Sequence, residues 1–428
     1  MSETVRTSGQ SETRSPGPAG EAADAPRRAG GSWPARALSG RSLLGLVAAF
    51  VLLLALLVAP FYVQEFWLRT GFAVFGAVVG AIGLNLLVGT TGQLSLAHAF
   101  FLAVGAFTYA YVCGEPGGVA TEVGGLGLPP LLGMVLGVLL AGVAGLIFSP
   151  IAARLRGIYL GVASLGLVFI GQHVLNTWTS VTGGFNGRLV PDFSLFGFSF
   201  TGTDPMLFVL GVRFGEAERL WYLGLFLALA AYLFARNLLR SRPGRALATL
   251  RDSETAAAVM GVNVQQYKAR VFLLSSMYAG LSGVLYALSI GSVSPESFTL
   301  ELSFLYLAMI VLGGLGSVAG AAIGALFVAA MPAVLQRYAD ALPFVSASGG
   351  AGVAAGEAAR YLFGLSIVLV VMFEPGGLVG LTRRFRQRSA RRPGAPPPAA
   401  ATPSNGSSRP PNAAPTVPSD PPAQGSTA

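Results

Sequence analysis

Residues 303–336 read SFLYLAMIVLGGLGSVAGAAIGALFVAAMPAVLQ and contain no charged side chain. As one helix rising about 1.5 Å per residue, this stretch would be about 50 Å long, whereas roughly 20 residues suffice to cross the ~30 Å hydrocarbon core of a membrane. Its middle, GGLGSVAG from Gly313 to Gly320, offers a break because glycine weakens a helix interior. The stretch is therefore predicted to form two short or re-entrant helices.

Further apolar runs lie on both sides of this stretch, and most approach the length of a membrane span. They cover about 43–63, 67–88, 96–114, 128–149, 157–178, 220–236, 271–291 and 360–381. With the broken stretch counted twice, the sequence predicts an all-α polytopic membrane protein with about ten transmembrane or re-entrant helices.

The composition excludes an ordinary soluble domain. Apolar residue types make up 53% of the 428 residues and charged types only 11%, against roughly 25% charged in soluble domains. The 57 glycines suit helices that approach one another closely in lipid. The single cysteine, Cys113, excludes an internal disulfide and a cysteine-based metal cluster.

The two ends of the chain differ from its middle. Residues 1–40 and 386–428 are rich in Pro, Ala, Ser, Gly and Arg and lack hydrophobic periodicity, so we expect two disordered cytoplasmic tails around a transmembrane domain at 41–385. A cleaved signal peptide is not expected, because the first apolar run begins near Leu43 and has the length of a full span.

The net charge of +9 indicates how the chain is oriented in the membrane. If both termini are cytoplasmic, the basic residues collect in cytoplasmic segments, as the positive-inside rule requires. The exceptions are Arg69, Arg188, Arg213, Arg219, Arg337 and Arg360. We therefore expect a cytoplasmic loop at 236–270, an external loop at 179–219 and no nucleic-acid partner.

Several kinds of chemistry are absent from the sequence. The central parts of the predicted spans carry no Asp, Glu, Lys or Arg, and for His98 and His173 a packing role is favoured over a proton relay. The one lysine, Lys268, is not in a phosphate-binding loop, and no metal or Ser/His/Asp motif occurs. We expect no catalytic residue, metal or cofactor, and any energy for transport would come from a partner. An ion-coupled carrier and a scaffold or receptor without flux remain alternatives.

A short helix is predicted in the cytoplasmic loop. Asp252 and Ser253 can cap its start, and Gly261 with Asn263 can end it. Its alanines, among them Ala256 and Ala257, would let it sit deep in a groove of another protein, and an ordinary solvated loop helix is equally compatible with the residues.

This loop resembles the EAA-x-x-x-G segment with which ABC importer permeases contact their ATPase subunits, although Thr255 replaces the usual Glu. The string RDSETAAAVMGVN is more specific and resembles permeases of branched-chain amino-acid (Liv-type) ABC transporters. The resemblance implies that ATPase coupling involves Arg251, Asp252, Ser253, Glu254, Ala256, Ala257, Gly261 and Asn263.

Three further motifs extend the resemblance over residues 43–385. They are GLNLLVGTTGQLSLAHAFFLAVGAF from Gly83, RLRGIY with the later TGGFNG, and FEPGGL from Phe373. The implied substrate pathway contains Asn85, Gln93, Ser95, His98, Asn176, Gly183, Gly184 and Asn186.

Polar residues at a break between apolar runs can line a cavity, and this lining would suit a zwitterionic or uncharged solute. Asn85 and Gln93 would equally suit hydrogen bonds between helices, and TGGFNG could be a plain surface turn or contact a binding protein. Small residues at four-residue spacing indicate helix packing rather than substrate contact. They are Gly76, Gly80, Gly316, Gly320 and Gly324.

The resemblance implies a multi-pass permease in the plasma (inner) membrane of a prokaryote, with both termini cytoplasmic. It would move branched-chain amino acids (leucine, isoleucine and valine) together with a second homologous permease, two ABC ATPase subunits that bind the ATP, and an external solute-binding protein. Related permeases for urea, amides or other amino acids are the alternatives within the family.

Overall fold

The computed structural model describes residues 40–380 except 118–123, 156, 203–206, 210–211, 340–344, 347–352 and 374–375. The predicted disordered tails, 1–40 and 386–428, lie outside the described residues apart from Gly40. Contacts divide the chain into two units, residues 1–59 and residues 60–428. Helix α1 (Gly40–Val58) belongs to the first unit, and η1 (Ala59–Phe61) lies at the boundary.

Helices dominate the second unit, and each strand among its described residues has two or three residues. The longer helices are α2 (Glu65–Leu84), which continues into the π-helical turn η2 (Asn85–Gly89), α3 (His98–Cys113), α4 (Pro130–Arg154), α5 (Ile158–Thr177), α7 (Glu216–Arg240), α8 (Arg242–Asp252), α10 (Val264–Ile290), α11 (Leu300–Gly313), α12 (Val318–Arg337) and α13 (Ala355–Phe373). The shorter helices are α6 (Thr179–Thr182), η3 (Gly184–Asn186), α9 (Glu254–Val259) and η4 (Pro295–Phe298). The strands are β1 (Arg188–Leu189), β2 (Ser194–Leu195), β3 (Phe198–Ser199), β4 (Leu207–Val209), β5 (Val212–Phe214), β6 (Ser292–Val293), β7 (Val345–Ser346) and β8 (Val353–Ala354).

The all-α membrane architecture predicted from hydropathy is confirmed, because a helix overlaps every predicted apolar run. Among the described residues, 6 helices are long and apolar enough to cross a membrane. The count of ten is approximate, because α3 and α11, with 16 and 14 residues, are only about 24 and 21 Å long at about 1.5 Å per residue.

Two helices form the centre of the bundle. The apolar windows of α2 and α10 are 78% and 72% buried, against 33–39% for the other long spans. Helix α10 packs on α4, α2 and α3, and α2 packs on α7. Glycines permit these contacts: a Cβ on Gly105 of α3 would lie 2.2 Å from the carbonyl oxygen of Gly280 in α10. Small residues therefore allow the backbones to approach, as is usual for helices in lipid.

The predicted break in residues 303–336 is confirmed, since α11 ends at Gly313 and α12 begins at Val318. The two helices pack antiparallel as a hairpin. A Cβ on Gly320 would lie 2.5 Å from the carbonyl oxygen of Gly313, and one on Gly324 would lie 1.9 Å from that of Met309. Gly316 belongs to the break, with φ +82°, and not to the small-residue face of α12 on which the sequence pattern placed it.

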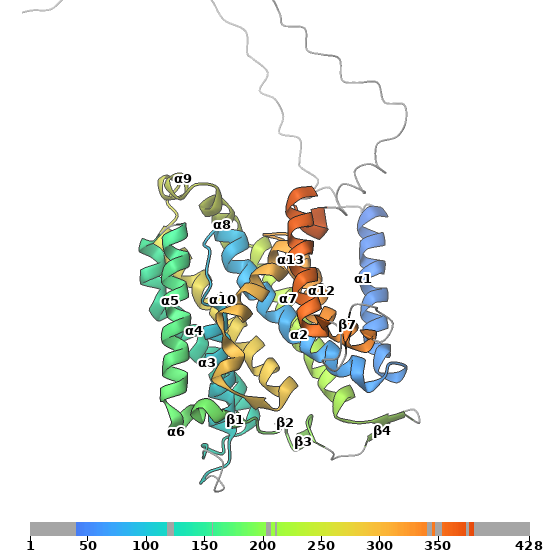
Figure 1. The fold of residues 1–428 in the computed structure, drawn as a ribbon. Helices are drawn as coiled ribbons and strands as arrows, with labels where there is room; N and C mark the ends of the chain where they lie inside the picture. Colours follow the sequence, from blue (N-terminus) through green and yellow to red (C-terminus); the bar gives the residue numbers. More distant parts are fainter. Residues whose placement is uncertain are drawn as a thin grey trace, which may run out of the picture. The chain divides into compact units, whose positions relative to one another are not determined.

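Strands β1–β4 lie at one end of the second unit, and helices α8 and α9 lie at the opposite end (Figure 1). We call these the strand end and the α8–α9 end. At the strand end, β1 pairs antiparallel with β6, with Arg188 opposite Val293, which fastens the loop after α5 to the loop after α10.

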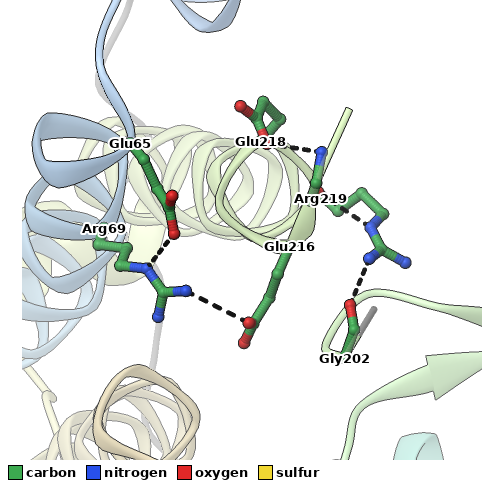
Figure 2. A network of polar contacts seen from close by, with 7 residues as sticks. Glu65, Arg69, Gly202, Glu216, Glu218 and Arg219 are labelled. Carbon is green, nitrogen blue, oxygen red and sulfur yellow. Dashed lines mark hydrogen bonds and ion pairs between the residues drawn. The ribbon is translucent and has the colours of Figure 1, made fainter. Parts of the chain in front are cut away.

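A polar network joins the first turns of α2 and α7 (Figure 2). Arg69 forms ion pairs with Glu65 at 2.9 Å and with Glu216 at 3.4 Å. Arg219 donates to the carbonyl oxygens of Gly215 at 3.0 Å and Gly202 at 2.6 Å. These arginines therefore fix helix starts and loop backbone at the strand end.

Candidate functional site

The chain unwinds between α2 and α3. After η2, residues 92–97 are non-helical, and α3 begins at His98. Two serine hydroxyls accept backbone N–H groups at this break: Ser164 of α5 accepts from Leu96 at 2.8 Å, and Ser303 of α11 accepts from Ala99 at 2.9 Å. Irregular backbone is tolerated at membrane depth where it is buried in protein or lines a cavity. Neither serine was predicted from the sequence, because their partners are far away along the chain.

Buried polar side chains surround this unwound segment. Asn85, Gln93 and His98 are 0%, 6% and 2% exposed. Within the described residues, no group pairs with Asn85 Nδ2, with either amide atom of Gln93 or with His98 Nε2. The His98 ring lies 4.8 Å from the ring of Tyr306 in α11. A buried unpaired polar group costs about 1–3 kcal/mol, so these groups are candidates for pairing with a ligand.

Two members of the predicted pathway are already engaged in this region. The Ser95 hydroxyl accepts the backbone N–H of Ala97 at 3.4 Å, which stabilises the local turn. The side-chain oxygen of Asn85 accepts the N–H of Gly316 at 2.9 Å, so this residue also joins η2 to the α11–α12 break. The Asn85 oxygen therefore joins two segments of the bundle, while its amide nitrogen has no partner among the described residues.

The remaining predicted pathway residues lie elsewhere. Asn176 is exposed on α5 and donates to the carbonyl oxygen of Gln172 at 3.0 Å. Gly183, Gly184 and Asn186 follow α5 at the strand end, whereas the unwound segment meets α5 near its start, where Ser164 accepts its N–H. The structure thus brings the unwound segment and His98 together with α5 and α11, but it places the TGGFNG residues in a separate loop.

The TGGFNG loop is closed by glycine geometry. Gly183, Gly184 and Gly187 all have positive φ, between 60° and 76°. A Cβ on Gly187 would lie 2.2 Å from the carbonyl oxygen of Val293. The sequence TGGFNG therefore forms a tight turn that packs directly on strand β6.

Arg188, the next residue, anchors the same loop. Its side chain is buried, donates to the carbonyl oxygens of Val181 and Gly124, and lies 5.3 Å from the centre of the Tyr111 ring. Burial lowers the pKa of the guanidinium, and Tyr111 opposes that effect. The sequence pattern gave no signal for these contacts beyond the position of an arginine after TGGFNG.

The α8–α9 segment contains two helices where the sequence predicted one. Ser253 caps α9, its hydroxyl accepting the N–H of Ala256 at 3.2 Å, and Gly261 follows with φ +82°. Asn263 does not end α9; its side chain accepts the N–H of Gln266 at 3.1 Å and caps the start of α10. Helix α8 was missed because it carries Pro243 and Gly244, which ordinarily indicate a loop.

The exposed face of α9 differs from the expected one. Ala257 is fully buried, so its side chain faces the protein and not a partner. Ala256 is exposed, and Val259 and Met260 are 85% and 73% exposed. A run of small residues carries no amphipathic pattern, and for that reason the sequence could not indicate which face points outward.

Two charged contacts hold this segment to the bundle. Glu254 of α9 pairs with the buried Lys268 of α10 at 2.6 Å. Arg251 at the end of α8 donates to the carbonyl oxygen of Gly89 in η2 at 2.6 Å. Asp252 is exposed between them. Of the residues implied in ATPase coupling, Arg251 and Glu254 therefore contact membrane helices directly.

Helix-packing contacts occur at the two predicted glycines of α2. A Cβ on Gly76 would lie 3.2 Å from the Cβ of Leu285 in α10, and one on Gly80 would lie 2.5 Å from the Tyr306 ring. Ser282 of α10 donates its hydroxyl proton to the carbonyl oxygen of Gly76 at 2.7 Å and accepts from the Tyr306 hydroxyl at 2.9 Å. Close approach and hydrogen bonds thus join α2, α10 and α11.

Residues 68–371 match the family described as the branched-chain amino acid transport system / permease component. The permease protein LivM of the Escherichia coli K12 high-affinity branched-chain amino acid transport system is 30% identical over 78% of this chain and 75% of its own length. The Salmonella typhimurium protein of the same name is 31% identical over 72% and 68%.

More distant relatives include the Escherichia coli K12 ribose import permease RbsC, 26% identical over 58% of this chain and 70% of its own length, and the permease LivH, 24% identical over 60% and 81%. No solved structure matches the chain at a significant level. The apolar helices, the unwound segment between α2 and α3 and these matches agree: the chain is a multi-pass membrane protein that belongs to the family of permease components of branched-chain amino acid transport systems.

Proposed function

We propose that the chain is the permease subunit of an ATP-driven importer for leucine, isoleucine and valine. It would pair with a second homologous permease, two ABC ATPase subunits would dock at the α8–α9 end, and an external binding protein would deliver the solute at the strand end. The α8–α9 end and both termini would then be cytoplasmic. The match to LivM over most of both chains supports the amino-acid substrate, and the relative named as a ribose permease covers less of this chain.

The exposed face of α9 is the observation that carries the proposal. Val259 and Met260 are apolar and exposed at the α8–α9 end, which the proposal places in the cytoplasm and therefore outside the lipid. Exposed apolar side chains in such a place mark contacts with another protein. Ser253 and the Glu254–Lys268 pair hold α9 in a fixed orientation, so an ATPase subunit would meet a rigid surface.

The unpaired groups of Gln93 and His98 suit the substrate step. Gln93 lies in the unwound segment and His98 is the first residue of α3, both inside the bundle, and these groups are neutral or weakly basic, which fits a zwitterionic solute with an aliphatic side chain. Leu94 and Phe100 supply apolar surface nearby, each packing on α5, against Gly161 and Gly171. The solute would exchange its hydration for these groups during passage.

Docking of the ATPase can be tested with the Met260→Asp variant. A charge at the centre of a buried protein contact is unfavourable, so we expect this variant to fold but to lose the ATPases on co-purification. Phe196→Asp is the matched control, because Phe196 is 97% exposed at the strand end. Retention of the ATPases by the Met260→Asp variant at wild-type levels would refute the proposed docking face.

A further inference from the structure

A positively charged side chain caps the C-terminal end of the central helix α2 and its continuation η2. The last carbonyl groups of a helix lack partners within the helix, and a positive charge there also complements the helix dipole. At the end of η2 this role falls to Arg251, whose Nη1 donates to the Gly89 carbonyl oxygen at 2.6 Å. The donor comes from α8, 162 residues further along the chain, and therefore from the segment that the proposed function assigns to ATPase coupling.

The same point touches the α11–α12 break. Gly89 lies directly against Gly316, since a Cβ on Gly89 would be 2.5 Å from the Gly316 nitrogen. The Asn85 side chain accepts the N–H of Gly316 at 2.9 Å. A Cβ on Gly316 would lie 2.9 Å from Arg251 Nη1. The end of α8, the turn η2 and the break between α11 and α12 thus meet at one point, where the side chains of Arg251 and Asn85 join their backbones.

The α11–α12 break is fixed on its other side as well. A Cβ on Gly377, in the FEPGGL motif, would lie 2.4 Å from the Cα of Gly314. Gly314 and Gly377 both have positive φ, at 112° and 71°. The break is therefore held between η2 and the segment after α13, and a shift of η2 would move it directly.

We propose that Arg251 is a positioning residue that links the α8–α9 segment to η2 and to the α11–α12 break, so that a movement of α9 reaches α2, α11 and α12 together. The inference rests on the proposed function for the origin of that movement. The Glu254–Lys268 pair supplies the second attachment, to α10. Through these two attachments, a shift of the α8–α9 segment would be transmitted to the central helices α2 and α10.

The test uses the Arg251→Ala variant and two companions. Arg245→Ala is the matched control, because Arg245 is an exposed arginine on the same helix α8, and Arg251→Lys keeps a donor that can reach the Gly89 carbonyl. The first measurement is amide hydrogen exchange on the full chain in lipid nanodiscs. The second is the number of ATP molecules hydrolysed per solute imported by the complete complex in proteoliposomes.

Loss of a charge-assisted hydrogen bond should speed exchange at the amides of residues 89–92 and 313–317 by roughly tenfold in the Arg251→Ala variant. The ATP hydrolysed per imported solute should rise by a similar factor, Arg251→Lys should restore part of both, and Arg245→Ala should change neither.

Unchanged exchange at both segments would overturn the inference. Faster exchange with unchanged ATP stoichiometry would also overturn it, because Arg251 would then be a local helix cap. A wild-type complex that shows no ATP-driven uptake would overturn the proposed function instead. The hydrogen-exchange measurement would still test the contact between Arg251 and Gly89.

Discussion

Two stretches of irregular backbone in this protein are held in opposite ways. In the TGGFNG loop at the strand end, the buried Arg188 binds the carbonyl oxygens of Val181 and Gly124 and lies over Tyr111. In the unwound segment between α2 and α3, serines secure the backbone, but no described group pairs with the side-chain amide of Gln93 or with Nε2 of His98.

The difference indicates that the two stretches have different roles, one structural and one in transport. The strand-end loop uses its polar groups to fix its own shape, which suits a static platform. The unwound segment keeps buried polar groups without protein partners, which lowers stability and is expected where a solute must pair with them. Stability and function should therefore separate when residues of the two stretches are changed.

The largest expected effect on stability comes from Arg188→Ala. The change leaves two carbonyl groups without their charged donor and removes the contact with the Tyr111 ring, so we expect a loss of about 2–4 kcal/mol in unfolding free energy. Thermal unfolding of the purified chain in detergent measures it. Arg337→Ala, which removes an exposed arginine, should change stability by less than about 0.5 kcal/mol. Equal effects of the two variants would remove the contrast between the stretches.

Gln93→Met should have an effect of intermediate size. It should raise the stability of the protein and lower its transport rate. Replacing an unpaired buried amide by an apolar side chain of similar length should stabilise the resting protein by about 1 kcal/mol. If the amide pairs with the solute, uptake should fall roughly tenfold for a loss of about 1.4 kcal/mol in binding. Thermal unfolding and initial uptake rates measure the two quantities. A variant that is stabilised and transports normally would show that Gln93 is not in the pathway.

The smallest expected effect is that of Arg69→Ala. Its ion pairs with Glu65 and Glu216 (Figure 2) are solvent-exposed, with the Arg69 side chain 53% exposed, and exposed pairs contribute only about 0–1 kcal/mol. The loss should shrink further when unfolding is measured at high salt. A loss as large as that from Arg188→Ala would mean that exposed and buried arginines at the strand end contribute alike.

The sequence predicted the parts of this structure that depend on local composition. Hydropathy located the membrane helices, the glycines at 313–316 located the break, and the glycines of TGGFNG indicated a tight turn. The contacts that define the site join residues far apart: Ser303 with Ala99, Gly316 with Asn85, and Arg251 with Gly89. Serines and arginines are too common for their partners to be inferred from a single sequence. The outward face of α9 was misjudged at Ala257 because a row of alanines has no polar side to mark it.

The most direct test of the account is uptake of labelled leucine by proteoliposomes that contain this chain, a homologous permease partner, two ATPase subunits and an external binding protein. The account predicts accumulation that requires ATP on the side of α9 and stops when the ATPases are omitted. Uptake by this chain alone, driven by an ion gradient without ATP, would contradict it.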